Sequence, residues 1–207
     1  MKLSIRKALA AAIPVLGLLP ALAADTWQID PAHSSAGFSV THLMISTVRG
    51  EFGAMTGTIV YDGKDVSSIK VDATIDAASV TTRNDSRDTD LRSDHFFDVK
   101  KFPTLTFKSK KVVPGPAGSF KLVGDLTMHG VTKEVTLDVK GPSQAIKGMR
   151  GETRVAASAT AILNRMDYGM SFDAKLADGG LVVSNDVAIT IDIEAVLPPA
   201  GPPPPKK

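Results

Sequence analysis

The stretch VTKEVTLDV, Val131–Val139, alternates apolar and polar residues along almost its whole length. Successive side chains of an extended chain point to opposite faces, so its valines and leucine gather on one face and its threonines and acids on the other. This pattern is typical of a strand with one face in an apolar interior and the other in water. The stretch therefore predicts a sheet that encloses a core on one side only.

Seven further segments show the same alternation, some strongly and some weakly. They are residues 38–42, 56–61, 69–75, 104–109, 120–128, 155–163 and 187–194. Turn-forming residues separate them, and His129-Gly130 between two alternating runs predicts a tight hairpin. The lack of long helical segments between these strands argues against a parallel α/β architecture.

About eight antiparallel strands in one chain favour either an up-and-down barrel or a sandwich. Several of these strands are roughly eight to ten residues long, and the tilted strands of a closed barrel need such length. Small residues on the inward faces, Gly124, Ala157, Ala159 and Ala161, leave room for a cavity, although they would also suit two closely packed sheets. We therefore expect an all-β fold, an eight-stranded antiparallel barrel with one or two short helices.

The first 23 residues predict a secretory signal peptide. Basic residues precede an apolar run over residues 8–19, and Ala21-Leu22-Ala23 supplies the small residues of a cleavage site. The apolar run is too short to span a bilayer. We therefore expect cleavage after Ala23, export to the periplasm, and no stable membrane span in the mature chain.

The mature chain is nearly neutral and has no cysteine. Of the 24 lysines and arginines, Lys2, Arg6 and Lys7 belong to the signal, which leaves 21 against 22 acidic residues, a net charge of about −1. This balance gives no case for nucleic acid as a partner. Without disulfides, stability must come from the core of one domain over residues 24–197, while the proline-rich residues 198–207 predict a disordered tail.

The usual catalytic and metal-binding patterns are missing from the sequence. His33 and His42 would point to opposite faces of one strand, and no pair of histidines has zinc-site spacing. The aspartates between residues 85 and 90 lack the glycine and the glutamate of an EF-hand loop. A Gly-x-Ser-x-Gly elbow is also absent. We therefore expect no catalytic residues, no metal site and no enzymatic activity.

The segment Arg83–Pro103 is crowded with charge yet contains the adjacent pair Phe96 and Phe97. Its polar residues have helical spacing, and Ser79, Thr81 or Thr82 could cap a short helix. We expect a solvated lid whose two phenylalanines cover an apolar opening. The alternative is that the two rings plug the end of a filled barrel.

Four blocks of sequence together resemble the YceI-like family of bacterial, often periplasmic, lipid-binding proteins. The blocks are TWQIDPAHSSAGFSVTHLMISTVRGEF from Thr26, SRDTDLRSDHFFDVKKFPTLTFKS from Ser86, GDLTMHGVTKEVTLDV from Gly124, and NRMDYGM from Asn164. The family often has a histidine where this chain has Asp90. The resemblance implies a lipocalin-like barrel whose apolar cavity holds a polyisoprenoid, such as an isoprenoid quinone or its precursor, or a fatty amphiphile.

On this resemblance we expect a bound isoprenoid-type lipid and no other cofactor. The expected wall and gate residues are large and apolar: Phe38, Val40, Phe52, Phe96, Phe97, Phe107, Leu126, Met128, Leu137 and Phe172. The expected cavity-mouth residues are Arg49, Asp90, Arg92 and His95, which could equally form solvated salt bridges.

The leading hypothesis is a periplasmic carrier for a polyisoprenoid or a similar long-chain lipid. A second hypothesis is an envelope-stress or assembly module that binds protein, with a filled barrel and with Phe96 and Phe97 exposed on its rim. A third, an enzyme acting on the lipid, would need turnover that depends on Asp94 or His95. The sequence leaves a homodimer open but shows no apolar dimer patch.

Overall fold

The computed structural model describes residues 24–53 and 55–199, so the predicted signal peptide and most of the proline-rich tail lie outside the described residues. Within this part, the chain forms one α-helix, α1 (Asp85–Arg92), and three short 3-10 helices, η1 (Val66–Ser68), η2 (Ala77–Ser79) and η3 (Arg165–Tyr168). All its other regular elements are strands. They are β1 (Asp25–Ile29), β2 (Ser35–His42), β3 (Ser46–Phe52), β4 (Met55–Tyr61), β5 (Lys70–Asp76), β6 (Val80–Thr81), β7 (Thr104–Pro114), β8 (Ser119–Met128), β9 (Val131–Lys140), β10 (Ile146–Lys147), β11 (Thr153–Asn164) and β12 (Asp186–Leu197).

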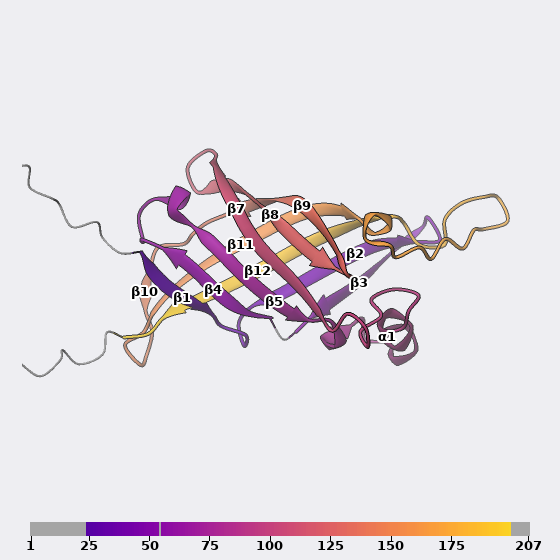
Figure 1. Cartoon of the computed structure of the whole chain (residues 1–207), viewed down its shortest axis with the longest axis horizontal. Helices are drawn as coiled ribbons and strands as arrows, with labels where there is room; N and C mark the ends of the chain where they lie inside the picture. The colour runs from indigo at the N-terminus through magenta and orange to yellow at the C-terminus, as the bar shows by residue number, and fades with distance from the viewer. Residues whose placement is uncertain (1–23, 54, 200–207) are drawn as a thin grey trace, which may run out of the picture.

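Eight antiparallel strands close into a barrel (Figure 1). The ring runs β1–β4–β5–β7–β8–β9–β11–β12, and β12 returns to β1 through the pairs Gln28↔Val196 and Ile29↔Ala195. Every neighbouring pair in the ring is antiparallel. The predicted all-β, eight-stranded lipocalin-like barrel is therefore confirmed.

Three positions of the barrel wall are each occupied by two consecutive strands, which accounts for three of the four strands outside the ring; the fourth, β10, pairs with β11. β12 pairs with β1 near its C-terminal end and with β2 over Ala188–Asp192, so β1 and β2 lie one after the other along the same neighbour. β3 and β4 likewise lie one after the other in the wall, because β3 pairs with β2 and β4 pairs with β1. β6 likewise extends β5 by pairing with β3. The barrel thus continues as a sheet beyond the closed ring.

The hairpin expected at His129-Gly130 is present between β8 and β9, whose last pair is Met128↔Val131. Both turn residues have positive φ, 52° and 73°, as a type I′ turn requires. Gly124 does not leave the room for a cavity that its small size predicted. A Cβ there would lie 2.6 Å from the Phe107 ring, so the space that this glycine leaves is filled by the phenylalanine.

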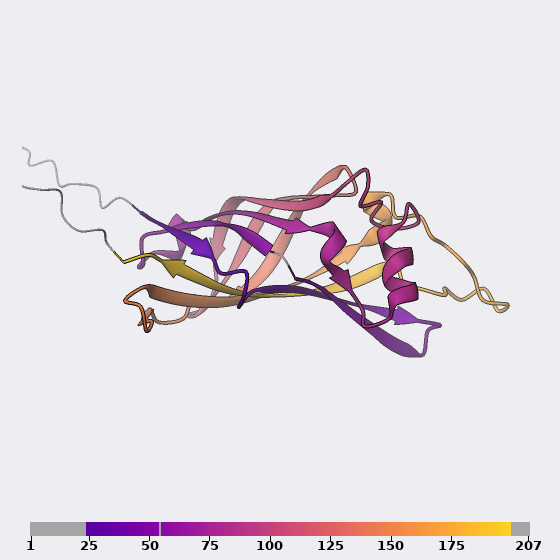
Figure 2. The ribbon, with the colours of Figure 1, turned by 90° about the horizontal axis from the view of Figure 1, so that it is seen from below.

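The two ends of the barrel differ in construction (Figure 2). We call the end that carries α1 and the 169–185 loop the lid end, and the end where β1 starts and β12 finishes the terminal end. Buried Trp27, Tyr61 and Phe120 belong to the core near the terminal end, while Phe52 and Tyr168 belong to a second core cluster at the lid end. In the described residues, no helix is long and apolar enough to cross a membrane.

Candidate binding cavity

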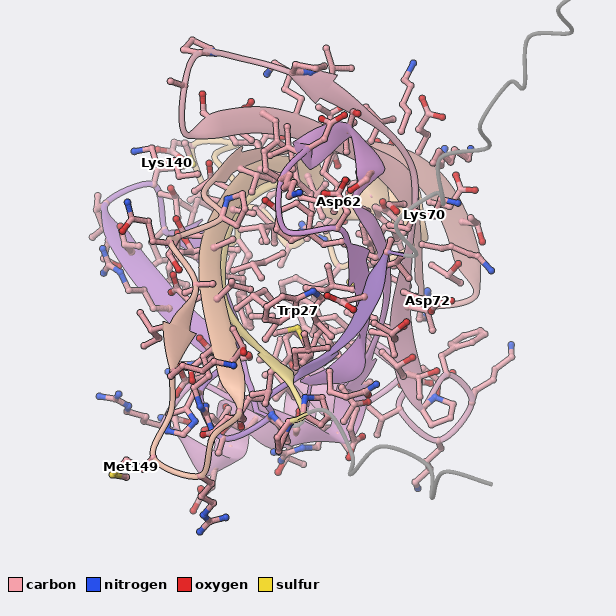
Figure 3. All side chains as sticks on the ribbon, turned by 90° about the vertical axis from the view of Figure 1, so that its left-hand side faces the viewer. Trp27, Asp62, Lys70, Asp72, Lys140 and Met149 are labelled. Carbon is pink, nitrogen blue, oxygen red and sulfur yellow. The ribbon has the colours of Figure 1, made fainter. Side chains whose placement is uncertain are left out.

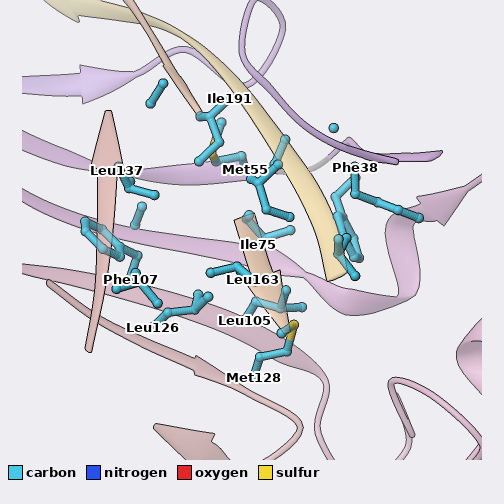
Figure 4. Close-up of a pocket in the computed structure, with 18 of the residues that line it drawn as sticks. Phe38, Met55, Ile75, Leu105, Phe107, Leu126, Met128, Leu137, Leu163 and Ile191 are labelled. Atoms are coloured by element: carbon cyan, nitrogen blue, oxygen red, sulfur yellow. The ribbon is translucent and has the colours of Figure 1, made fainter. Parts of the chain in front are cut away.

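An elongated apolar cavity of about 460 Å³ runs inside the barrel. Ligand pockets typically measure about 300–1,000 Å³. The alternating strands supply its wall, since the apolar side chains of each strand point into the barrel. Figure 4 shows Phe107 and Leu137 on one side of the cavity, with Met55 and Ile191 on another. The cavity begins near Trp27 at the terminal end, where Figure 3 looks along the barrel, and reaches Phe96 at the lid.

All ten residues predicted as wall or gate line this cavity. Phe38 and Val40 come from β2, Phe52 from β3, Phe107 from β7 and Leu137 from β9. The structure places them around one space, whereas their contact with a ligand stays a prediction.

Several other residues that line the cavity were not among the predicted site residues. Met55 and Ile59 on β4, and Trp27 on β1, contribute to the terminal half of the wall. The Trp27 indole donates a hydrogen bond to the Tyr61 carbonyl at 3.3 Å, which holds the ring across this end. The alternation of residues 69–75 and 187–194 already indicated inward faces there, and Ile75 and Ile191 do line the cavity.

Of the four predicted mouth residues, only Asp90 lines the cavity. Arg92 instead donates hydrogen bonds to the carbonyls of Ala78 and Val80, at 2.9 and 2.6 Å. Arg49 lies on β3 outside the cavity lining. Arg49, Arg92 and His95 therefore do not line the cavity, and a role for them at its mouth stays a prediction.

His95 forms an ion pair with Asp90 on the outer side of the lid. The Nδ1–Oδ1 distance is 2.8 Å, and both side chains are exposed. The hydrogen bond that His95 donates to the Asp90 carboxylate, together with the negative charge of Asp90, raises the pKa of His95 above its ordinary value. The pair is thus a solvated salt bridge, the alternative that the sequence left open.

The lid itself is anchored by buried charge, which corrects the expectation of a wholly solvated lid. Asp88 is only 4% exposed and accepts hydrogen bonds from the Thr82 amide, at 2.7 Å, and from the Thr81 and Thr82 hydroxyls. Burial by itself raises the pKa of Asp88, but these hydrogen bonds outweigh it and leave the pKa lowered. Arg87 adds a 2.7 Å bond from Nε to the Thr82 hydroxyl.

Helix α1 is capped by Asn84, whose side chain accepts from the Arg87 amide. Ser79, Thr81 and Thr82 were expected to serve as caps. Thr81 and Thr82 instead bind Asp88, because the chain at Arg83 adopts positive φ, 62°, and carries these threonines back against the second turn of the helix. The charged helix is therefore tied to β6, and its position over the barrel is set.

Phe96 and Phe97 cover the lid end from inside. Phe97 packs edge-on against Phe52 with ring centroids 5.2 Å apart, and Phe96 lies 5.3 Å from Phe172 of the 169–185 loop. Phe96 is buried and both rings line the cavity. The two rings therefore guard a cavity rather than fill one.

Arg165 is the main residue of this end that the sequence did not single out. It is 4% exposed, lines the cavity, and donates to the carbonyls of Met170, at 2.6 Å, and Ser184, at 3.0 Å. A further bond reaches the Asn185 side chain at 3.0 Å, and burial lowers the pKa of the guanidinium. Both ends of the 169–185 loop are therefore tied to one buried charge.

One acidic group at the terminal end has side-chain atoms close enough to hold a cation: Asp30, His33 and Glu194. Arg154 already binds both carboxylates, and its Nη1 lies 2.9 Å from Asp30 Oδ2. With this charge between the carboxylates, the arrangement is an ion-pair network and no metal needs to be invoked. His33 lies in the turn before β2, so it does not share a strand with His42 as expected.

Comparison with known proteins shows which proteins this chain is similar to. The family model described as "YceI-like domain" matches residues 27–195. A UPF0312 protein of Staphylococcus aureus is 37% identical over 168 residues, which cover 81% of this chain and 95% of the relative. The crystal structure of a Campylobacter jejuni YCEI protein is 32% identical, with a TM-score of 0.66 over 76% of this chain and 90% of that one.

A more distant structure shares the fold. It is a polyisoprenoid binding domain from Saccharophagus degradans, described as implicated in plant cell wall breakdown. It is 18% identical to this chain, with a TM-score of 0.60 over 83% of this chain and 98% of that one.

Proposed function

Because the chain belongs to the YceI-like family, we propose that it binds a single long apolar chain of the polyisoprenoid type inside its barrel. The isoprenoid class follows the polyisoprenoid binding domain that shares its fold. We further propose that export after cleavage at Ala23 delivers the protein to the periplasm, where it acts as a carrier.

The cavity is the observation that carries this proposal. Its wall is built almost entirely from aliphatic and aromatic side chains. Each methylene moved from water into such a wall stabilises a complex by about 0.8 kcal/mol before ordering costs. A long hydrocarbon therefore gains affinity along the whole barrel without any polar recognition, and Met55 and Met128 can adapt to irregular chains.

A binding role fits the cavity better than catalysis. Two cationic groups at its lid end are occupied: Arg165 by backbone carbonyls and Arg87 by Thr82. Asp90 is paired with His95 in solvent. No nucleophile activated by a neighbouring base is formed by these groups.

Nor are the expectations of the filled-barrel hypothesis met. That hypothesis required exposed rim phenylalanines and no cavity of ligand size. Phe96 is buried, and the cavity measures about 460 Å³. The carrier hypothesis therefore has the stronger physical basis.

The test is to produce the full chain with its own leader in a Gram-negative host and to isolate it from the periplasmic fraction. Intact mass should show a chain beginning at Ala24. Mass spectrometry of a solvent extract should show an isoprenoid lipid at about one molecule per chain. A barrel that is empty after gentle purification and that takes up no added prenol would refute the proposal.

Ala159 and Thr160 offer a matched pair of variants for the same test. Ala159 is buried in the cavity wall, and its neighbour Thr160 faces solvent. Ala159→Phe should reduce the extracted lipid strongly because its ring occupies the cavity, while Thr160→Phe should leave the yield of lipid unchanged. Thermal unfolding of both variants distinguishes lost binding from lost folding.

A further inference from the structure

The barrel wall has a weakly paired seam between β9 and β11. The even shorter β1–β12 pairing is continued along β12 by β2, whereas no strand in the described part of the chain continues the β9–β11 pairing toward the lid end. β9 and β11 share only three residue pairs, Ser158↔Lys140, Ala159↔Val139 and Thr160↔Asp138. By contrast, β11 pairs with β12 along its full length from Thr153 to Asn164, and β9 pairs with β8 along its full length. The closed ring therefore depends on three pairs at this position.

The unpaired part of the seam faces the lid end. Continuing the same register would set Ile162 opposite Thr136 and Asn164 opposite Glu134, but no pairing joins these residues. The far end of the gap is closed where His129 Nδ1 and the Tyr168 carbonyl lie 2.9 Å apart. The result is a window bounded by strand pairs on one side and by a single side-chain hydrogen bond on the other.

The cavity lies directly behind this window, which is closed by packed apolar side chains. Val135 and Leu137 on β9 and Leu163 on β11 flank it and line the cavity from within. Outside, Ile162, near the C-terminal end of β11, is 74% exposed. An apolar path thus leads from the surface at Ile162, past Leu163, into the interior.

Both ends of the barrel are held more firmly than this seam. At the lid end, Asp88 and Arg165 bind backbone groups of the segments that would have to move. At the terminal end, Trp27 adds a side-chain hydrogen bond between the paired strands β1 and β4, and Arg154 joins Asp30 to Glu194. Opening either end breaks several hydrogen bonds made by buried or ion-paired groups, whereas widening the seam first breaks one hydrogen bond at its edge.

We propose that the β9–β11 seam is a lateral portal through which an apolar chain enters and leaves the barrel while the lid stays closed. The inference rests on the proposed function, because it assumes that the cavity takes up such a chain. A long chain passes sideways between Val135 and Leu163, and the exposed Ile162 provides its first apolar contact.

A cross-link across the seam tests the portal. Because the chain has no native cysteine, only the introduced cysteines can react. The double variant Thr136→Cys with Ile162→Cys, oxidised or bridged with a short bis-maleimide, ties the two strands across the window. The control is Thr127→Cys with Thr132→Cys on the paired β8 and β9, whose native hydroxyls lie 2.8 Å apart. NBD-labelled farnesol serves as the probe, and stopped-flow fluorescence follows its loading and its release to phosphatidylcholine vesicles.

The bridged seam should slow both loading and release by about tenfold or more, with the equilibrium affinity little changed, and reduction of a disulfide should restore the rates. The control pair should have no effect on either rate. Unchanged rates in a fully cross-linked seam overturn the portal. Failure of the unmodified protein to load the probe overturns both the portal and the proposed function, so the two failures are distinguishable.

A second comparison needs no cross-link. Leu163→Ala at the window and Leu122→Ala on the fully paired β8 remove the same group from the cavity wall. Leu163→Ala should speed loading and release together, whereas Leu122→Ala should raise the release rate only as far as it weakens affinity. Equal loading rates in the two variants contradict the portal.

Discussion

The two ends of the barrel are stabilised by different means. At the terminal end, regular strands close the ring, aromatic residues line its interior, and Arg154 binds three carboxylates, those of buried Glu152 and of half-buried Asp30 and Glu194. At the lid end, the strands give way to α1 and the 169–185 loop. There, single buried charges bind backbone groups, Asp88 on one side and Arg165 on the other.

The difference follows from where backbone hydrogen bonds can be made. Strand pairing satisfies the backbone at the terminal end, so charged side chains there bind one another at the surface. Irregular segments leave backbone groups without partners, and leaving such groups buried and unpaired costs about 1–3 kcal/mol each. At the lid end a buried charge satisfies several of them at once, and the lid is therefore expected to be rigid.

The largest expected effect comes from Arg165. Arg165→Met leaves the carbonyls of Met170 and Ser184 without their donor, and we expect the free energy of unfolding to fall by about 3–5 kcal/mol. Arg154→Met at the terminal end should cost less, because the Arg154 side chain is 24% exposed, against 4% for the residue Arg165, and its carboxylate partners keep partial contact with water. Denaturant unfolding of both variants measures the difference, and equal losses would contradict the contrast between the ends.

Removing the Asp88 charge should have the next largest effect. Asp88→Asn keeps the shape but weakens the hydrogen bonds from Thr81 and Thr82, so a loss of about 2 kcal/mol is expected. Asp85→Asn on the exposed side of the same helix is the control. Hydrogen exchange of the α1 amides should accelerate in the first variant only.

The Asp88 carboxylate also predicts that the free energy of unfolding depends on pH. Because the folded-state pKa of Asp88 is lowered, its contribution to stability is fully present above the ordinary aspartate value and is lost as pH falls through the folded pKa. The lid end should therefore loosen in acid in the native protein, and Asp88→Asn should flatten this dependence. Unfolding curves at a series of pH values below about 4 provide the measurement.

Replacing Tyr168 should change the free energy of unfolding by a smaller amount and in the opposite direction. It is 2% exposed, and its hydroxyl has no hydrogen-bond partner among the described residues. Burial raises the pKa of Tyr168 to about 12. Tyr168→Phe should raise the free energy of unfolding by about 1 kcal/mol, since an unpaired buried hydroxyl is removed. A destabilised variant would instead indicate a bound water or ligand at this hydroxyl.

The smallest effect is expected at the exposed His95–Asp90 pair. Its contribution is present below the ordinary histidine pKa and is lost as pH rises through the raised value. Asp90→Asn should return the pKa of His95 to about 6.5 with little change in stability, because exposed ion pairs contribute little. An NMR titration of the histidine ring protons records this shift.

Much of the barrel and its wall could be predicted from the sequence because strand facing is a local property. The alternation of residues 131–139 indicates which side chains point inward, and the predicted wall residues do line one cavity. The charged lid was harder to predict, since a polar residue on a short helix gives no local sign of whether it faces water or a neighbouring segment. Asp88 shows this, because Thr82 reaches it only through the reversal of the chain at Arg83.

The sequence by itself determined the all-β class, the turn at His129-Gly130 and the apolar inner face, because period-two patterns and turn residues act over a few neighbouring positions. Tertiary structure alone decided the burial of Asp88 and Arg165 and the weak seam between β9 and β11. The register at that seam is set by closure of the whole ring, and the partners of Arg165 lie up to 20 residues away along the chain. Those contacts depend on distances in space that no local pattern encodes.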